Sequence, residues 1–172
     1  AAFLESGVTR RAYASGQVAV HLWNPRDYAQ GNYRRVDDRP FGGGPGMVML
    51  AEPLQHCLEA IRAARAAENV QESEQAAPLV LFSPIGTTLK HAAVANWAES
   101  QGAVLLCGRY EGIDQRFIDT CVDEEISMGD FVLTGGEIPA MAVADAVCRM
   151  VPGVLSDDVC FRRERDAMVD FR

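Results

Sequence analysis

Three stretches of this sequence decide its fold: LVLFSPIG (79–86), AVLLCGRYEG (103–112) and FVLTGGEIP (131–139). In each stretch an apolar run leads into a turn of small residues. We expect the apolar runs to be strands, at 79–82, 103–107 and 131–133.

Helix-forming residues follow each turn. We expect helices near 88–100 and 114–120, and a third that has Pro139 in its first turn, where proline is tolerated. Apolar strands that alternate with helices predict an α/β fold with a mostly parallel sheet and helices on both faces.

The three turns predict where a ligand binds, because ligands of such sheets lie beyond the carboxyl ends of the strands. Neither GxGxxG nor GK[ST] occurs in the sequence, and Lys90 is its only lysine. A cradled triphosphate is therefore not expected. A compact ligand without phosphate, with an adenine edge held by backbone groups, fits the turns better.

The remaining segments are interpreted from local pattern. Residues 4–17 suit a short helix, VAVHLW (18–23) a strand, and 52–67 an amphipathic helix. Residues 24–46 are too rich in turn formers for any regular element, and a loop of that length is usually functional or disordered. NVQESEQAAP (69–78) is predicted to be a mobile surface connection.

Composition limits the class of protein. With 172 residues, 48% of them apolar, we expect one domain, with no membrane span and no signal layout, in the cytoplasm. The net charge of −8 argues against a surface that binds nucleic acid everywhere. Arginine outnumbers acid only in residues 1–40 and 161–172, so RNA contacts are expected at the ends of the chain, although solvated charges without a partner would look the same.

Longer motifs carry a family resemblance. DDRPFGGGPGM (37–47), CGRYEGID (107–114) and SMGDFVLTGGEIPAM (127–141), followed by VPGVL (151–155), resemble the bacterial tRNA (guanine-N1)-methyltransferases of the SPOUT superfamily. The resemblance implies a deep C-terminal trefoil knot, which no periodicity argument predicts. It also implies a homodimer with active sites at the subunit interface, and a tRNA substrate methylated at N1 of the guanosine 3′ of the anticodon.

The resemblance further implies domain limits. The SPOUT domain would span residues 1–155 and lack its first strand. Residues 156–172 would be a linker at the start of a truncated tRNA-binding region.

The implied cofactor is S-adenosylmethionine, and the residues that match the family's cofactor loops come from all three turns. They are Ser83, Pro84, Gly108, Tyr110, Glu111, Gly112, Ser127, Met128, Gly129, Asp130, Phe131, Val132, Leu133, Gly135, Gly136 and Pro139. Two neighbouring positions, Leu81 and Ile85, depart from the tyrosine and glutamine that relatives carry.

Catalysis at N1 of guanine needs a base for the N1 proton and a cation near O6. By resemblance Arg149 supplies the cation, although an Asp145–Arg149 pair on a helix surface is the plainer interpretation. The base aligns with Asp166, or with Glu164 if no residues are inserted.

The glycine-rich segment that would border the target guanine comprises Asp38, Arg39, Gly43, Gly44, Pro45 and Gly46. Mg²⁺ is implied by the family, whereas no residue pattern indicates a protein-ligated metal.

Three alternatives remain open. The chain could bind S-adenosylmethionine or RNA without catalysis, or it could be another SPOUT methyltransferase acting on ribose or rRNA. A nucleotide-dependent oxidoreductase would also suit a parallel sheet, although the missing GxGxxG counts against it.

Overall fold

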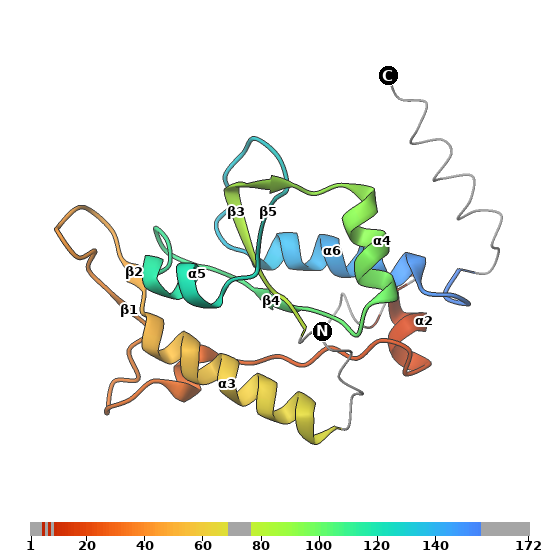
Figure 1. The fold of residues 1–172 in the computed structure, drawn as a ribbon, viewed down its shortest axis with the longest axis horizontal. Coiled ribbons are helices and arrows are strands. Elements are labelled where there is room, and N and C mark those ends of the chain that lie inside the picture. Colours follow the sequence, from red (N-terminus) through yellow and green to blue (C-terminus); the bar gives the residue numbers. More distant parts are fainter. Residues whose placement is uncertain (1–4, 6, 8, 69–76, 156–172) are drawn as a thin grey trace. The chain divides into compact units, whose positions relative to one another are not determined.

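The structure is a computed structural model that describes residues 5, 7, 9–68 and 77–155 (Figure 1). The chain forms two compact units. The larger consists of the described parts of 22–89 and 101–140, and the smaller of those in 1–21, 90–100 and 141–172.

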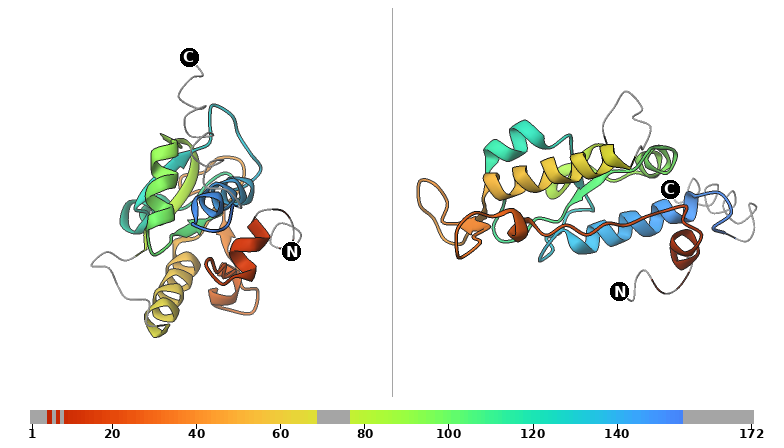
Figure 2. Two further views of the ribbon diagram at one scale, coloured as in Figure 1. Left: turned by 90° about the vertical axis from the view of Figure 1, so that its right-hand side faces the viewer. Right: turned by 90° about the horizontal axis from the view of Figure 1, so that it is seen from below.

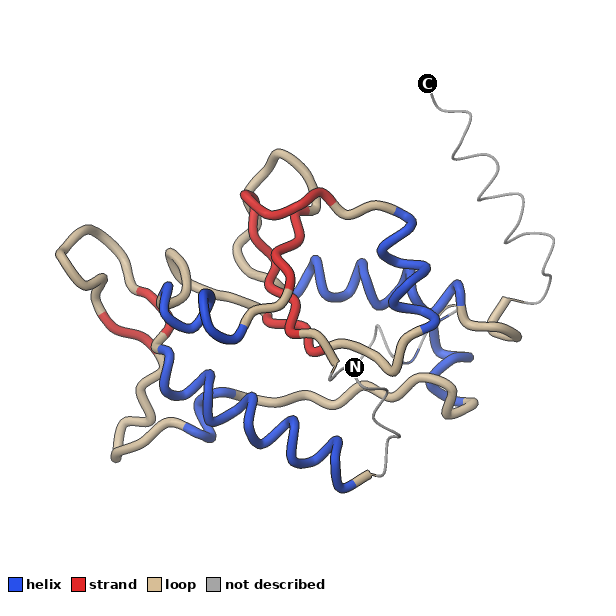
Figure 3. Tube along the Cα trace, viewed as in Figure 1, coloured by secondary structure: helices blue, strands red, loops and turns tan. Residues whose placement is uncertain are grey.

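A parallel three-stranded sheet organises the larger unit. Strand β3 (Leu79–Thr88) lies between β4 (Val104–Leu106) and β5 (Glu124–Ser127), and both neighbours run parallel to it. Figure 3 colours the strands red. The predicted α/β class and parallel pairing are confirmed. The predicted first two strands correspond to β3 and β4.

The third strand differs from the prediction. Residues 131–133 form no strand, and Glu124–Ser127 takes that place in the sheet instead. Phe131 and Val132 have 54% and 82% of their surface exposed, so apolarity at this segment does not reflect sheet burial. β5 tolerates two glutamates because, among the described residues, it pairs only with β3, and because only its last two residues are buried.

Strand β3 is longer than predicted because it contains an irregularity. Phe82 and Thr87 both align with Ile126 of β5, so residues 83–86 leave the ladder and the strand then resumes. Pro84, which has no N–H to donate, falls in this excursion. The helix that follows, α4, is correspondingly short, at His91–Glu99.

Two helices cover one face of the sheet. Helix α3 (Ala51–Ala67) confirms the predicted amphipathic helix, and it lies beside α5 (Gln115–Cys121) (Figure 2). Leu79 and Leu81, two residues apart on β3, face the same side. They form a buried cluster with Leu54 and Leu58 of α3 and Phe117 of α5. Each such side chain contributes about 1.5–3 kcal/mol to folding.

The segment before α3 has more regular structure than predicted. Within 24–46 lie a 3₁₀ helix, η1 (Pro25–Tyr28), and strand β1 (Asp37–Asp38), which pairs antiparallel with β2 (Val48–Met49). The Asn24 side chain caps η1 by accepting a hydrogen bond from the Arg26 N–H. The helix begins with Pro25, which is well tolerated at the first helical position.

Residues 18–23, predicted as a strand, form no regular element, and Leu22 is 88% exposed. An apolar run without a ladder partner does not become a strand.

The smaller unit contains helix α2 (Thr9–Ala14), α4 and the later part of α6 (Glu137–Met150). Its core includes Ala12, Cys148 and Val154. The Cys148 thiol donates to the Tyr13 hydroxyl at 3.6 Å. Pro139 lies in the first turn of α6 as expected. None of the helices in the described part of the chain is long and apolar enough to cross a membrane.

Candidate functional site

A cavity of about 370 Å³ lies where the glycine-bearing turns meet, entirely within the larger unit. Its volume falls in the range of about 300–1,000 Å³ that is common for small-molecule sites. The irregular stretch 83–86 within β3, the turn after β4 and the segment from β5 to α6 all contribute to its wall. The structure therefore brings together the three turns that the sequence pattern singled out.

Nearly all the predicted cofactor residues line this cavity. They are Ser83, Pro84, Gly108, Tyr110, Glu111, Gly112, Met128, Gly129, Phe131, Val132, Leu133, Gly135, Gly136 and Pro139. Ser127 and Asp130 do not line it.

Ser127 shapes the wall from behind. Its side chain is buried, and its hydroxyl donates to the Gly129 carbonyl at 3.1 Å and accepts from the Gly129 N–H at 3.2 Å. This closed pair of bonds fixes the turn that follows β5. Asp130 is exposed.

Backbone contacts join the turn after β4 to the start of α6. The Gly136 N–H donates to the Gly108 carbonyl at 3.1 Å. A Cβ at position 136 would lie 2.6 Å from Cys107 Cα and 3.1 Å from Gly108 N. Position 136 therefore admits only glycine without movement of the backbone.

A second set of backbone bonds joins the glycine-rich loop to the cavity. The Glu111 N–H donates to Met47 O at 3.0 Å, Met49 N–H to Gly112 O at 2.9 Å and Asp114 N–H to Met49 O at 2.9 Å. The loop thus ends against the cavity wall, where Gly46 contacts the Glu111 side chain.

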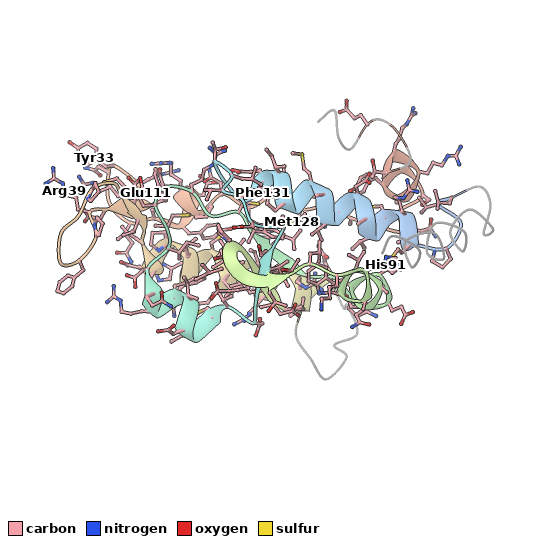
Figure 4. All side chains as sticks on the ribbon, turned by 90° about the horizontal axis from the view of Figure 1, so that it is seen from above. Tyr33, Arg39, His91, Glu111, Met128 and Phe131 are labelled. Atoms are coloured by element: carbon pink, nitrogen blue, oxygen red, sulfur yellow. The ribbon has the colours of Figure 1, made fainter. Side chains whose placement is uncertain are left out.

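Figure 4 shows Tyr33 and Arg39 at the same end of the larger unit, with Glu111 between them and Phe131. All the residues predicted to face RNA are exposed: Asp38, Arg39, Gly43, Gly44, Pro45 and Gly46.

The cavity rim carries one ion pair and a perturbed thiol. Arg109 Nε donates to Glu137 Oε1 at 2.7 Å. The pKa of the nearby Cys107 thiol is raised to about 11, chiefly by burial; the Glu137 carboxylate also raises the pKa, and Arg109 lowers it by less. Cys107 is therefore neutral near pH 7 and not a nucleophile.

Tyr110, in the turn after β4, adopts a left-handed backbone conformation, with φ of 63°. A non-glycine residue there stores strain of the kind that concentrates at functional sites.

The predicted catalytic residues are Arg149 and either Asp166 or Glu164. Arg149 occupies the last turn of α6, in the smaller unit, and is partly buried. Asp166 and Glu164 lie outside the described residues.

Sequence reasoning missed several lining residues, including Arg109, Gln115, Glu125 and Thr134. Arg109 lies within the motif CGRYEGID (107–114), so this motif could have indicated that Arg109 lines the cavity. Glu125 was missed because β5 was not predicted.

Comparison with known proteins places this geometry in a family. The model of the family described as "tRNA (Guanine-1)-methyltransferase TrmD" matches residues 1–167. The chain belongs to this methyltransferase family. Among its relatives, a tRNA (guanine-N(1)-)-methyltransferase of Paracidovorax citrulli is 70% identical over 155 residues, covering 90% of this chain and 59% of the relative. One of Polaromonas sp. is 67% identical over 156 residues, covering 91% and 59%.

A solved member of the family shares the fold. The crystal structure of tRNA (m1G37) methyltransferase from Aquifex aeolicus superposes with a TM-score of 0.75 at 36% identity, covering 91% of this chain and 66% of that chain. The present chain thus spans about three fifths of the length of these two curated relatives. The family resemblance inferred from the motifs is confirmed.

Proposed function

We propose that this chain forms the cofactor-binding core of a tRNA (guanine-N1)-methyltransferase that acts on the guanosine 3′ of the anticodon, in the cytoplasm. The observation that carries the proposal is the meeting of the three motif-bearing turns around one cavity. Family membership supplies the reaction class. The trefoil knot, and a SPOUT domain over residues 1–155, are part of the same proposal.

The cavity suits S-adenosylmethionine. Its wall consists of glycine turns that expose backbone groups, together with apolar side chains such as Phe131 and Leu133, which suit an adenosine. Two carboxylates, Glu111 and Glu125, are compatible with a cationic ligand. Among the described residues, Arg109 is the only Lys or Arg side chain that lines the cavity, so the lining offers little positive charge for a phosphate-bearing ligand.

The chain's own residues would do four things. The irregular stretch 83–86 within β3 and the turns after β4 and β5 hold the adenosine and exclude water. When bound, S-adenosylmethionine supplies an activated methyl group. Asp166 accepts the N1 proton of guanine, and Arg149 stabilises the charge that develops on O6. A neutral N1 that keeps its proton is a poor nucleophile, so loss of the base would abolish transfer without abolishing cofactor binding.

RNA would approach over the segment 24–46. Tyr33 is exposed at 88%, and Arg35 and Arg39 are exposed beside it in sequence, a combination that suits base stacking and phosphate contact. Backbone bonds tie the end of this segment to Glu111 and Gly112, so bound RNA would lie next to the cofactor.

A homodimer would complete the site. By family resemblance, the arginine that serves one cavity, Arg149, comes from a second copy of the chain. Phe131, Val132 and Ile138 expose large apolar surfaces around the cavity segment, which is unusual for a solitary protein. Ile138→Glu should convert the dimer to monomers in sedimentation velocity, and an unchanged dimer would place the interface elsewhere.

Mg²⁺ stays in the proposal on family resemblance alone. The described residues contain no group of three or more His, Cys, Asp or Glu that could hold a metal. No residue of this chain is assigned to the ion.

Calorimetric titration with S-adenosylmethionine and S-adenosylhomocysteine tests the cofactor site, with Gly135→Val as the control. Primer extension on a tRNA transcript, which stops at N1-methylguanosine, then tests the reaction. Micromolar binding that is lost in Gly135→Val supports the site. Binding without methyl transfer would favour a binding module without catalysis, and a folded chain that binds neither ligand would contradict the proposal.

A further inference from the structure

Arg109 and Glu137 join the two turns that lie on either side of the cavity rim. Arg109 follows β4, whereas Glu137 opens α6, and the Nε–Oε1 distance is 2.7 Å. The side chains are 58% and 45% exposed. Arg109 also lines the cavity.

We infer that Arg109 and Glu137 are positioning residues that latch these two turns and set the affinity for the charged cofactor. The inference deepens the proposed function and rests on it. We assign neither residue a contact with the reacting atoms. Both act through the shape and charge of the cavity wall.

The latch lies beside a backbone bond that joins the same turns. The Gly136 N–H donates to Gly108 O at 3.1 Å, one residue away from each member of the ion pair. Breaking the ion pair would leave this single bond to hold the turns together at the rim. The expected consequence is a wall that opens more often, and hence weaker ligand binding.

Gly135 leaves the space in which the pair closes. A Cβ at this position would fall inside van der Waals contact of the Glu137 carboxylate and 3.2 Å from Arg109 Nε. The obstructing atoms lie near the ends of flexible side chains. Gly135→Ala should therefore push the pair apart without a backbone clash.

Charge gives the latch a second effect. In the described part of the chain, Arg109 is the only Lys or Arg that lines the cavity, and Glu137 neutralises its charge. S-adenosylmethionine carries one positive charge more than S-adenosylhomocysteine. Without the Glu137 carboxylate, the positive charge of Arg109 is no longer neutralised and repels the sulfonium. The affinity for S-adenosylmethionine should therefore fall more than the affinity for S-adenosylhomocysteine.

The decisive variant is Glu137→Gln, studied in the full chain by calorimetric titration with both ligands. An ion pair this exposed contributes little to stability, so the melting temperature should hold. We expect about two- to fivefold weaker binding of S-adenosylhomocysteine, and a further loss of about twofold for S-adenosylmethionine.

Asp27→Asn is the matched control. Asp27 pairs with Arg34 at 3.5 Å, and both side chains are similarly exposed, at 62% and 61%. This pair lies away from the cavity lining, so its loss should leave both affinities unchanged. The charge-swapped double variant Arg109→Glu with Glu137→Arg should recover part of the binding that either single variant loses.

Hydrogen exchange in the ligand-free chain provides a readout that does not depend on the cofactor. The Gly136 amide should exchange faster in Glu137→Gln and in Gly135→Ala than in the wild type. Combining these two variants should add little, because both remove the same interaction.

Three results would overturn the inference. One is Glu137→Gln binding both ligands as the wild type does, with unchanged exchange at Gly136. Another is equal loss for both ligands accompanied by a lower melting temperature, which would make the pair merely structural. A wild-type chain that binds neither ligand would contradict the proposed function itself, whereas the first two results would leave that function standing.

Discussion

Replacing Gly136 by alanine should damage both stability and cofactor binding. The new methyl group would meet Cys107 Cα at 2.6 Å and Cys107 C at 3.2 Å. These are backbone atoms, so no rotamer change relieves the contact. The turns must separate, and the Gly136–Gly108 hydrogen bond of 3.1 Å lengthens or breaks.

The magnitude follows from three contributions. Overpacking of this kind costs about 1–3 kcal/mol. Loss of the hydrogen bond costs about 0.5–1.5 kcal/mol. Alanine lowers the entropy of the unfolded chain, which offsets about 0.4–1 kcal/mol. We expect the free energy of unfolding to fall by about 1–3 kcal/mol, measured by urea denaturation.

Gly108→Ala is the matched control for stability. It lies in the opposite turn, and its methyl group would lie 3.3 Å from the flexible Ile113 Cδ1, with ordinary van der Waals contacts to Ile113 Cγ1 at 3.7 Å and Leu81 Cδ1 at 3.8 Å. We expect a cost below about 1 kcal/mol there. In Gly136→Ala, S-adenosylhomocysteine binding should weaken at least about tenfold, equivalent to about 1.4 kcal/mol. If Gly136→Ala matches Gly108→Ala in stability and binds ligand normally, the backbone clamp is not what shapes the cavity.

Three further predictions concern residues that are adjacent in sequence to those lining the cavity. Ser127→Ala removes both bonds to Gly129 and should lower the free energy of unfolding by about 1–2 kcal/mol, with weaker ligand binding by calorimetry; an unaffected variant would show that the turn holds without them. Asp114 caps α5, and its hydrogen bond with Arg116 lowers its pKa below the ordinary 3.8. Its stabilising effect is therefore present above that pH and lost as the pH falls through the lowered pKa. Asp114→Asn should flatten this acid dependence in urea titrations between pH 5 and pH 2, whereas an unchanged slope would assign it to other carboxyls. Because burial raises the pKa of Cys107 to about 11, iodoacetamide at pH 8 should modify it about 100-fold more slowly than an unstructured thiol, as followed by peptide mass spectrometry; comparable rates would mean that the thiol is not protected.

The apolar runs in the sequence correctly predicted two strands, β3 and β4. The third strand, β5, was predicted at the wrong place. Val80, fully buried, and its neighbours form the continuous apolar run typical of a central parallel strand. Glu124–Ser127 has no such run, because an edge strand is stabilised by its ladder with β3, which is a long-range contact. Phe131 and Val132 look like a strand in sequence, yet they are exposed.

The position of the ligand cavity could be predicted because the rule for parallel sheets depends on strand ends, and these were located to within a few residues at β4. The contacts that build the cavity could not. The Arg109–Glu137 pair spans 28 residues, and the contact of Gly46 with Glu111 spans a longer stretch still. Neither separation leaves a periodic trace in the sequence.

The turns are held together chiefly by main-chain atoms. This explains why short glycine-containing motifs were enough to indicate the family. Gly136 meets the Cys107 backbone directly, and Met49 bonds to the backbone at Gly112. At position 136 the contact leaves no room for a Cβ, so geometry requires glycine there. Phe131 and Val132 line the cavity, but their side chains are 54% and 82% exposed and take no part in these contacts between turns. Changes at the clamping glycines should therefore impair formation of the cavity, while changes at the exposed apolar residues should impair only what the finished cavity binds.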